Sequence, residues 1–203
     1  MVCQAAEAHD EDAAPVVADF LSVNARIAKP GSGHTILFQV GYKGSVEFVR
    51  LEHFAVVGIE ARTSNAREMT SEGSIGKIWE RFRRQNLAEK IPNRADSNII
   101  AVYTDYASDE HGDYTYLLGA KVTAVAETPE GMSVRNVPTG RYAIFSSARG
   151  AVPKVVIEAW QRIWVEPRTA EYSRNYRTDF ERYGTESADP ANSRVDIYIG
   201  VRD

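Results

Sequence analysis

The residue with the clearest potential for chemistry is Glu181, which lies in the segment Asp179-Phe180-Glu181-Arg182-Tyr183. Side chains alternate between the two faces of a strand, so Glu181 and Tyr183 are expected on one face and Phe180 on the other. If Phe180 packs toward the helices, Glu181 and Tyr183 face an uncovered cleft. A carboxylate among aromatic rings loses hydration and is stabilised by a cation or a hydroxyl donor. The segment predicts a charged binding group or, as the alternative, a surface ion pair between Glu181 and a neighbouring arginine.

Aromatic side chains are the second feature, because the chain has ten Tyr, seven Phe and three Trp. Rings supply much of the contact area in small-molecule pockets, and a ring beside a bound cation adds ~0.5–2 kcal/mol of cation–π attraction. Trp160 and Trp164 are expected to lie mainly in the core, and Tyr114 and Tyr116 to pack within the sheet. A site for a flat, lipophilic, positively charged ligand is predicted from Glu181 together with Tyr103, Tyr183, Tyr198 and Trp79.

Metal and triad chemistry find no support in the sequence. The four histidines are scattered without ligand spacing, and the motifs His-Glu-x-x-His, Cys-x-x-Cys and Gly-x-Ser-x-Gly do not occur. The single cysteine, Cys3, cannot form an internal disulfide. We therefore expect no metal and no cofactor.

Two units with the same order of elements are predicted after residue 47. The first has a strand at 53–59, a helix at 74–85 and strands at 98–104 and 114–122; the second has a strand at 140–145, a helix at 153–164 and strands at 178–183 and 195–201. This order predicts an α+β fold, a tandem βαββ duplication of repeats 48–125 and 132–203 with pseudo-twofold symmetry. We expect helices on one side of the sheets and a ligand cleft between the repeats. Ala101 takes the place of Glu181 in the first repeat.

Charge and composition limit the partners of this 203-residue chain. The net charge of −4 argues against direct binding of nucleic acid. Residues 1–47 hold six acidic and three basic residues, and they are expected to form a partly disordered arm that could dock a separate protein. No stretch of about 18 apolar residues predicts a membrane span, and the N-terminus lacks the pattern of a secretory signal, so a cytoplasmic location is expected.

Five segments together resemble the GyrI-like effector-binding domain family and, within it, the stand-alone integron-cassette branch. Their order and spacing carry this resemblance over about residues 48–203, and the segments are 54–58, 113–119, 137–145, 180–183 and 195–199. The resemblance implies the duplicated βαββ fold. It also implies that a buried glutamate at the position of Glu181 meets cationic drugs and that a tyrosine at the position of Tyr198 lines the pocket. The chain lacks the DNA-binding module of the family's multidrug regulators, and Gly200 stands where the family usually has proline.

Three functions are compatible with these features. The leading hypothesis is a protein that binds lipophilic cationic or aromatic small molecules without a cofactor. In the second, Glu181 acts as a general base in the hydrolysis of strained, cyclopropane-containing genotoxins, a reaction that the resemblance implies for some stand-alone members. In the third, the protein is a ligand-responsive adaptor for a separate transcription regulator.

Overall fold

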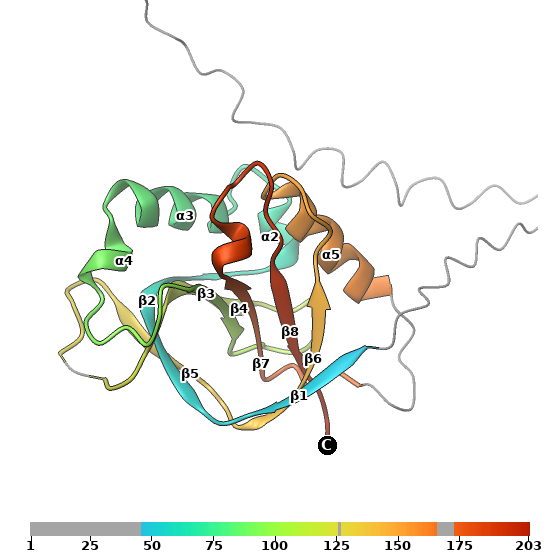
Figure 1. Ribbon diagram of the computed structural model, residues 1–203. Coiled ribbons are helices and arrows are strands. Elements are labelled where there is room, and N and C mark those ends of the chain that lie inside the picture. The colour runs from blue at the N-terminus through green and yellow to red at the C-terminus, as the bar shows by residue number, and fades with distance from the viewer. Residues whose placement is uncertain (1–45, 126, 166–172) are drawn as a thin grey trace, which may run out of the picture. The chain divides into compact units, whose positions relative to one another are not determined.

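The computed structural model describes residues 46–125, 127–165 and 173–203, and all of them belong to one compact unit, Val40–Asp203 (Figure 1). The predicted arm therefore lies outside the described residues, except for its last two positions. Glu47, which we assigned to the arm, begins the first strand.

The core of the domain is one antiparallel sheet with the strand order β1-β6-β8-β7-β3-β4-β2-β5. The predicted α+β class is confirmed, and the strands predicted at 114–122 and 178–183 coincide with β4 and β7. The bounds are β1 Glu47–Leu51, β2 Phe54–Thr63, β3 Ile99–Thr104, β4 Tyr114–Val122, β5 Ser133–Val137, β6 Gly140–Ser146, β7 Thr178–Tyr183 and β8 Asp196–Gly200.

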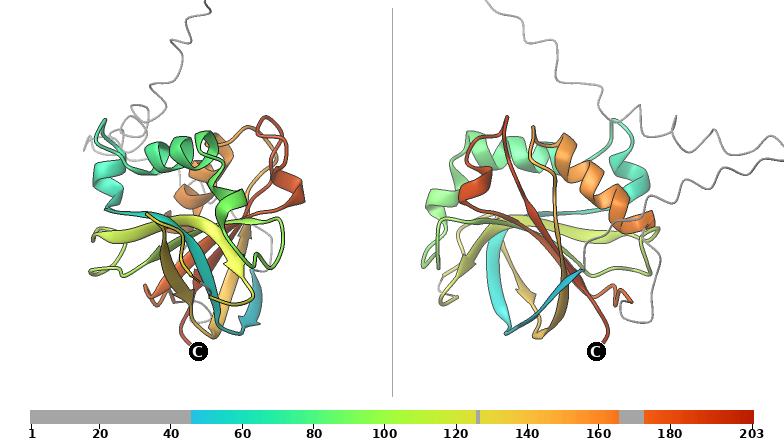
Figure 2. Two further views of the ribbon diagram at one scale, coloured as in Figure 1. Left: turned by 90° about the vertical axis from the view of Figure 1, so that its left-hand side faces the viewer. Right: turned by 45° about the vertical axis from the view of Figure 1, so that its right-hand side comes forward.

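Two longer helices, α3 (Ile75–Arg84) and α5 (Lys154–Val165), lie over the same face of the sheet (Figures 1 and 2). Helix α3 contacts β2 and β4, whereas α5 contacts β6. The central strand pair β3–β7 therefore runs between the footprints of the two helices. Shorter helical segments are α2 (Asn65–Glu68), α4 (Leu87–Lys90) and the 3-10 turn η1 (Thr185–Ser187).

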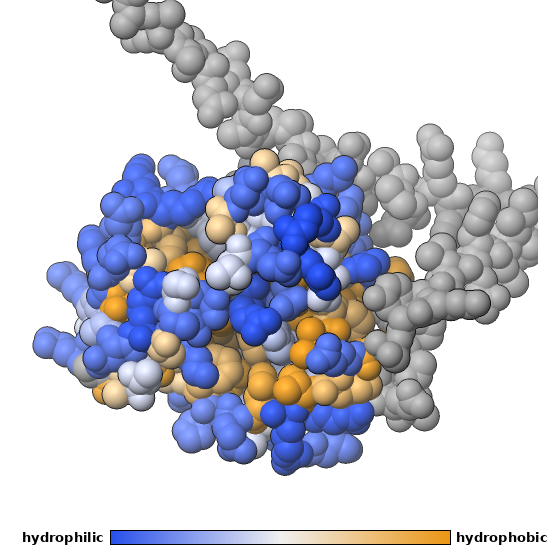
Figure 3. All heavy atoms as spheres, viewed as in Figure 1, coloured by the Kyte–Doolittle hydropathy of each residue, from blue (hydrophilic) through white to orange (hydrophobic). Residues whose placement is uncertain are grey.

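A side chain that precedes α3 explains where this helix starts, and the apolar residues of α3 explain its orientation. The carboxylate of Glu68 accepts hydrogen bonds from the backbone N–H groups of Ser74 and Ile75, which satisfies donors that a helix N-terminus leaves free. Ile78 and Phe82, one turn apart, are buried against the sheet. The opposite side of the helix is charged, and the surface over α3 and α4 is mostly hydrophilic in Figure 3.

Each face of the sheet has its own hydrophobic cluster. The cluster beneath the helices includes Phe82, Tyr116 and Trp160, whereas the other includes Phe180 and Tyr198 together with six further buried residues of the sheet. The sheet curls around this second cluster (Figure 2). Our expectation that Phe180 packs toward the helices and that the face without helices holds an open cleft is therefore wrong, because Phe180 helps to fill that face.

No helix within residues 46–125, 127–165 and 173–203 is long and apolar enough to cross a bilayer.

A close approach of β2 and β4 provides a test of this sheet. Gly58 and Gly119 are directly opposite each other, and a Cβ atom on Gly119 would lie 2.0 Å from the carbonyl oxygen of Val57. We expect Gly119→Ala to lower the free energy of unfolding by about 1–3 kcal/mol or more, because the backbones must move apart. Urea denaturation measures this change.

Gly76→Ala in α3 is the matched control, since a Cβ there would meet no atom within 4 Å. Alanine should stabilise this helix position by up to ~1 kcal/mol. Equal effects of the two substitutions would contradict the close approach.

Candidate functional site

Glu181 lies on β7 at the centre of the sheet, where it is directly opposite Ala101 of β3. Residues opposite each other in an antiparallel pair share a face, so the small Ala101 leaves room beside the carboxylate. The side chain points to the face covered by α3 and α5, and it is only 1% exposed. A carboxylate is thus buried beneath the helices.

Three neutral donors hold this carboxylate. The hydroxyl of Tyr103 and the indole N–H of Trp160 donate to Oε1 over 2.7 and 2.6 Å, and the hydroxyl of Tyr183 donates to Oε2 over 2.8 Å. These groups come from β3, α5 and β7, so the sheet and the helix together position the acid. Among the described residues, no arginine or lysine forms an ion pair with Glu181.

Aromatic rings pack around these contacts. Tyr103 meets Trp160 at 4.9 Å and Tyr116 at 5.1 Å between ring centroids, and Trp79 of α3 meets Tyr183 at 4.8 Å. All three pairs are edge-to-face, which is a favourable geometry for rings. We call these five aromatic residues and Glu181 the aromatic cluster. Trp79 and Tyr183 are its only partly exposed members.

Burial dominates the electrostatics of the cluster. Burial raises the pKa of Glu181, while the hydrogen bonds from Trp160, Tyr103 and Tyr183 lower it by less. Burial, followed by the nearby Glu181, raises the pKa of the Tyr103, Tyr116 and Tyr183 hydroxyls well above the usual value. The phenols therefore stay protonated at neutral pH and remain available as donors.

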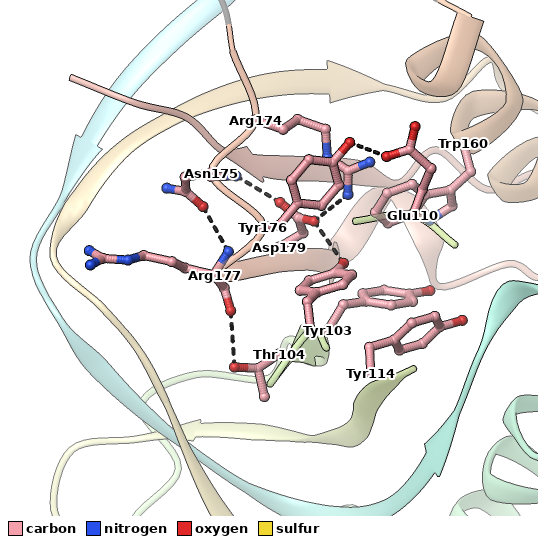
Figure 4. Close-up of polar contacts among 12 residues, drawn as sticks. Tyr103, Thr104, Glu110, Tyr114, Trp160, Arg174, Asn175, Tyr176, Arg177 and Asp179 are labelled. Atoms are coloured by element: carbon pink, nitrogen blue, oxygen red, sulfur yellow. Dashed lines mark hydrogen bonds and ion pairs between the residues drawn. The ribbon is translucent and has the colours of Figure 1, made fainter. Parts of the chain in front are cut away.

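A second buried acid on the same strand is neutralised. Asp179 is fully buried, and its Oδ2 accepts from the guanidinium of Arg174 at 2.6 Å and from the hydroxyl of Tyr106 at 2.8 Å. Figure 4 shows Arg174 and Asp179 together beside Tyr176 and Trp160, and the guanidinium of Arg174 lies 4.4 Å from the ring centroid of Tyr176.

Gly200 contributes to this ion pair, because its backbone N–H donates to Oδ1 of Asp179 at 2.8 Å. The proline that the family resemblance leads one to expect at this position has no N–H and could not make this bond. The departure at Gly200 is therefore matched by a specific contact.

The structure brings together most, but not all, of the predicted site residues. Tyr103, Tyr183 and Trp79 lie on the same face of the sheet as Glu181. Tyr198 lies on the other face, where its ring stacks on Phe180 at 4.4 Å, so the sheet separates it from Glu181. The alternative of a surface ion pair for Glu181 is also wrong, because this carboxylate is buried and bound by neutral donors.

Two members of the cluster, Trp160 and Tyr116, were not among the predicted site residues, because the sequence favoured packing as the main role of both side chains. The helical spacing placed Trp160 on the buried face of its helix, but it gave no sign that the indole N–H meets an acid. Tyr116 could have been found from strand pairing, because it is directly opposite Tyr103. Within the described ranges, no group of three or more His, Cys, Asp or Glu side chains could hold a metal ion.

The fold is a curled antiparallel sheet with two helices on one face, and comparison with known proteins gives the family. The chain belongs to the integron-associated effector binding proteins, whose family model matches residues 47–201. This match confirms the resemblance inferred from the sequence.

Two relatives of about 30% identity and one more distant protein of the same fold resemble this chain. The YobU protein of Bacillus subtilis (strain 168), named as a candidate transcriptional regulator, is 31% identical over 153 residues, which are 75% of this chain and 93% of YobU. An integron cassette protein from the mobile metagenome of Vibrio cholerae has a TM-score of 0.64 and 32% identity, over 77% of this chain and 95% of that one. SAV2435, solved with tetraphenylphosphonium, has the same fold at a TM-score of 0.64 and 17% identity, over 78% and 94% of the two chains.

The raised pKa of Glu181 has a consequence for stability. The folded state holds the Glu181 proton more tightly than the unfolded chain, whose glutamates titrate near the ordinary value of 4.5. The contribution of Glu181 to stability is therefore lost as the pH rises from about that value through the folded-state pKa. Glutamine does not titrate, so the Glu181→Gln variant should become more stable relative to wild type as the pH is raised. Urea denaturation of both proteins at several pH values measures this difference in the free energy of unfolding.

Glu80→Gln is the matched control, because this α3 side chain is 67% exposed. Its difference from wild type should stay small. If the stability of Glu181→Gln relative to wild type stays constant or falls as the pH rises, the pKa of Glu181 is not raised in the folded protein.

The ion pair of Arg174 with Asp179 gives a second test. Removing one partner of a buried pair leaves an uncompensated charge, so Arg174→Met should lower the free energy of unfolding by about 3–5 kcal/mol. Arg149→Met is the control, because Arg149 and Glu186 form an ion pair with both side chains about half exposed, which contributes at most ~1 kcal/mol. If denaturation curves show an equally small loss in the free energy of unfolding for both variants, Arg174 has no structural role.

Proposed function

We propose that the protein binds lipophilic cationic or aromatic small molecules in the aromatic cluster, with Glu181 supplying the charge complementarity. The observation that carries this proposal is the buried carboxylate, held by three neutral donors and by no cationic side chain of the described residues. A buried charge without a counter-ion is costly, and a bound cation would reduce that cost. The rings of Tyr103, Tyr183 and Trp79 would add stacking area and cation–π attraction.

A ligand must displace side chains to reach Glu181, which is 1% exposed. Trp79 and Tyr183 are in edge contact and are the partly exposed members of the cluster. We infer that a ligand enters by parting these two rings, which then flank it. The tetraphenylphosphonium bound to SAV2435, a protein of the same fold, supports an aromatic cation as the ligand class.

We also infer that the fold is a tandem duplication with pseudo-twofold symmetry. The strand order supports this. If β1, β2, β3 and β4 are exchanged with β5, β6, β7 and β8, respectively, and the order is then read backwards, the same strand order results. The two halves then meet at the centre of the sheet in the β3–β7 pair, where Ala101 is opposite Glu181, and also in the β1–β6 and β2–β5 pairs. The acid would thus lie at the junction of the repeats, and the site would lie between them.

The hydrolase hypothesis uses the same acid in another way. A general base needs a carboxylate lone pair for the attacking water, and a carboxylate offers about four acceptor positions. Three of them are taken by Tyr103, Trp160 and Tyr183. About one position is left for an attacking water, so the hydrogen bonds alone do not decide between the two functions. We propose binding because Glu181 has no counter-charge among the described residues, which favours a cationic ligand. Mass spectrometry after incubation with a cyclopropane-bearing alkylator would detect hydrolysed product if turnover occurs.

The name of YobU as a candidate transcriptional regulator favours a role for such binding in gene control. We propose that role as an adaptor, in which ligand occupancy changes contact with a separate regulator.

Glu181→Gln tests the binding proposal directly. The substitution keeps the side-chain size but removes the charge, and interactions with a charged partner contribute about 1.5–3 kcal/mol. We expect the affinity for a planar lipophilic cation to fall roughly 10- to 100-fold in calorimetric titrations. Unchanged affinity would rule out Glu181 as the binding group.

The control variant for this titration is Glu80→Gln, on the exposed side of α3, which should bind like wild type. A neutral molecule of the same shape should bind wild type and Glu181→Gln with similar affinity. Loss of affinity for both the neutral molecule and the cation would instead indicate a collapsed site.

A further inference from the structure

The hydrogen bonds of the aromatic cluster run in one direction. A tyrosine hydroxyl has a single hydrogen, and Tyr103 and Tyr183 both use theirs on Glu181. The indole N–H of Trp160 can only donate, and it is also used on Glu181. The two phenol oxygens therefore keep lone pairs but have no hydrogen left for another partner. A group that approaches them must bring its own hydrogens.

The hydroxyl of Tyr116 adds an unused polar group at the same place. Tyr116 is fully buried, and its oxygen has no hydrogen-bond partner among the described residues. Its ring packs against Tyr103, and Glu181 is close enough to raise its pKa. The indole of Trp79 is near enough to lower the pKa of this hydroxyl, but the two groups do not have the geometry of a hydrogen bond. Buried hydroxyls are rarely left unpaired in native proteins.

Together these groups define what the cluster can accept. It offers a buried negative charge on Glu181, the phenol oxygens of Tyr103 and Tyr183 as acceptors, and the free hydroxyl of Tyr116. We propose that the ligand is a protonated amine that carries N–H hydrogens, attached to an aromatic body, and that the Tyr116 hydroxyl is one of its hydrogen-bond partners. This inference rests on the proposed binding of cations at Glu181, and it specifies their class.

This preference depends on whether the cation can donate hydrogen bonds to the buried oxygens. A quaternary cation can satisfy the charge and the rings, but it brings no N–H group, so the Tyr116 oxygen stays buried without a partner among the described residues, as it is in the free protein. An ammonium group also loses water on entering, but its hydrogens find the phenol oxygens. The ammonium therefore gains hydrogen bonds to buried oxygens that the quaternary cation cannot make, and hydrogen bonds that involve a charged group are the stronger ones.

The test compares three molecules with the same two-ring body: 2-naphthylmethylammonium, its N,N,N-trimethyl analogue and neutral 2-naphthalenemethanol. Calorimetry on the full chain at pH 7 measures their affinities. We expect the ammonium to bind wild type at least about 10-fold more tightly than the trimethyl analogue, as unpaired buried acceptors would imply. Both cations should bind more tightly than the neutral alcohol.

Tyr116→Phe tests whether the Tyr116 hydroxyl binds the N–H group of the ammonium. This variant should lose most of the preference for the ammonium, whereas its affinity for the trimethyl analogue should stay within about twofold of wild type. Its melting temperature should not fall, because no hydrogen bond of the free protein is removed. Tyr142→Phe is the matched control, since this buried tyrosine on the other face donates to Pro138, and it should keep the full preference.

Three results would overturn the inference. Equal affinity of wild type for the two cations would refute the amine class while leaving cation binding intact, provided that both cations bind more tightly than the alcohol. An unchanged preference in Tyr116→Phe would refute the role of this hydroxyl. If neither cation binds more tightly than the alcohol, the proposed function and the inference both fail.

Discussion

The structure of the site depends on the cost of keeping a carboxylate out of water at the centre of a sheet. Glu181 can be tolerated there only because donors converge on it from β3, β7 and α5. These contacts tie the helix to the middle of the sheet, and they fix the orientation of each ring that supplies a donor. The shape of the aromatic cluster therefore follows from the need to solvate one charge with protein groups.

Two acids on the same strand meet this requirement in different ways. Asp179 is paired with a guanidinium, a phenol and a backbone N–H, so its charge and its lone pairs are satisfied within the protein. Glu181 has donors but no counter-charge among the described residues. The fully satisfied acid is suited to a structural role, and the acid whose charge is left unbalanced is suited to a ligand. Proximity on one strand thus does not imply a shared role.

Much of the fold could be predicted from periodicity, because the inner strands and the two long helices have clear apolar patterns. Strands β1 and β5 were missed because they lie at the edges of the sheet, and charged residues such as Arg50 and Arg135 interrupt their patterns. Alternation correctly separated Glu181 from Phe180, but it could not say which face the helices cover, since both faces of this sheet are apolar. Tyr198 was misplaced for the same reason. The pairing of Trp160 with Glu181 joins segments 21 positions apart, and it depends on tertiary packing that no local pattern encodes.

The positions of the edge strands have a consequence for how the domain folds. β1 is early in the chain, yet among the strands that the structure describes it pairs only with β6, and β5 pairs only with β2. Each half of the chain therefore completes its sheet with a strand from the other half, and these pairings join residues that are far apart in sequence. Such contacts raise the contact order and slow folding. Neither half has a complete sheet without the other, so we expect the domain to fold and unfold as one cooperative unit.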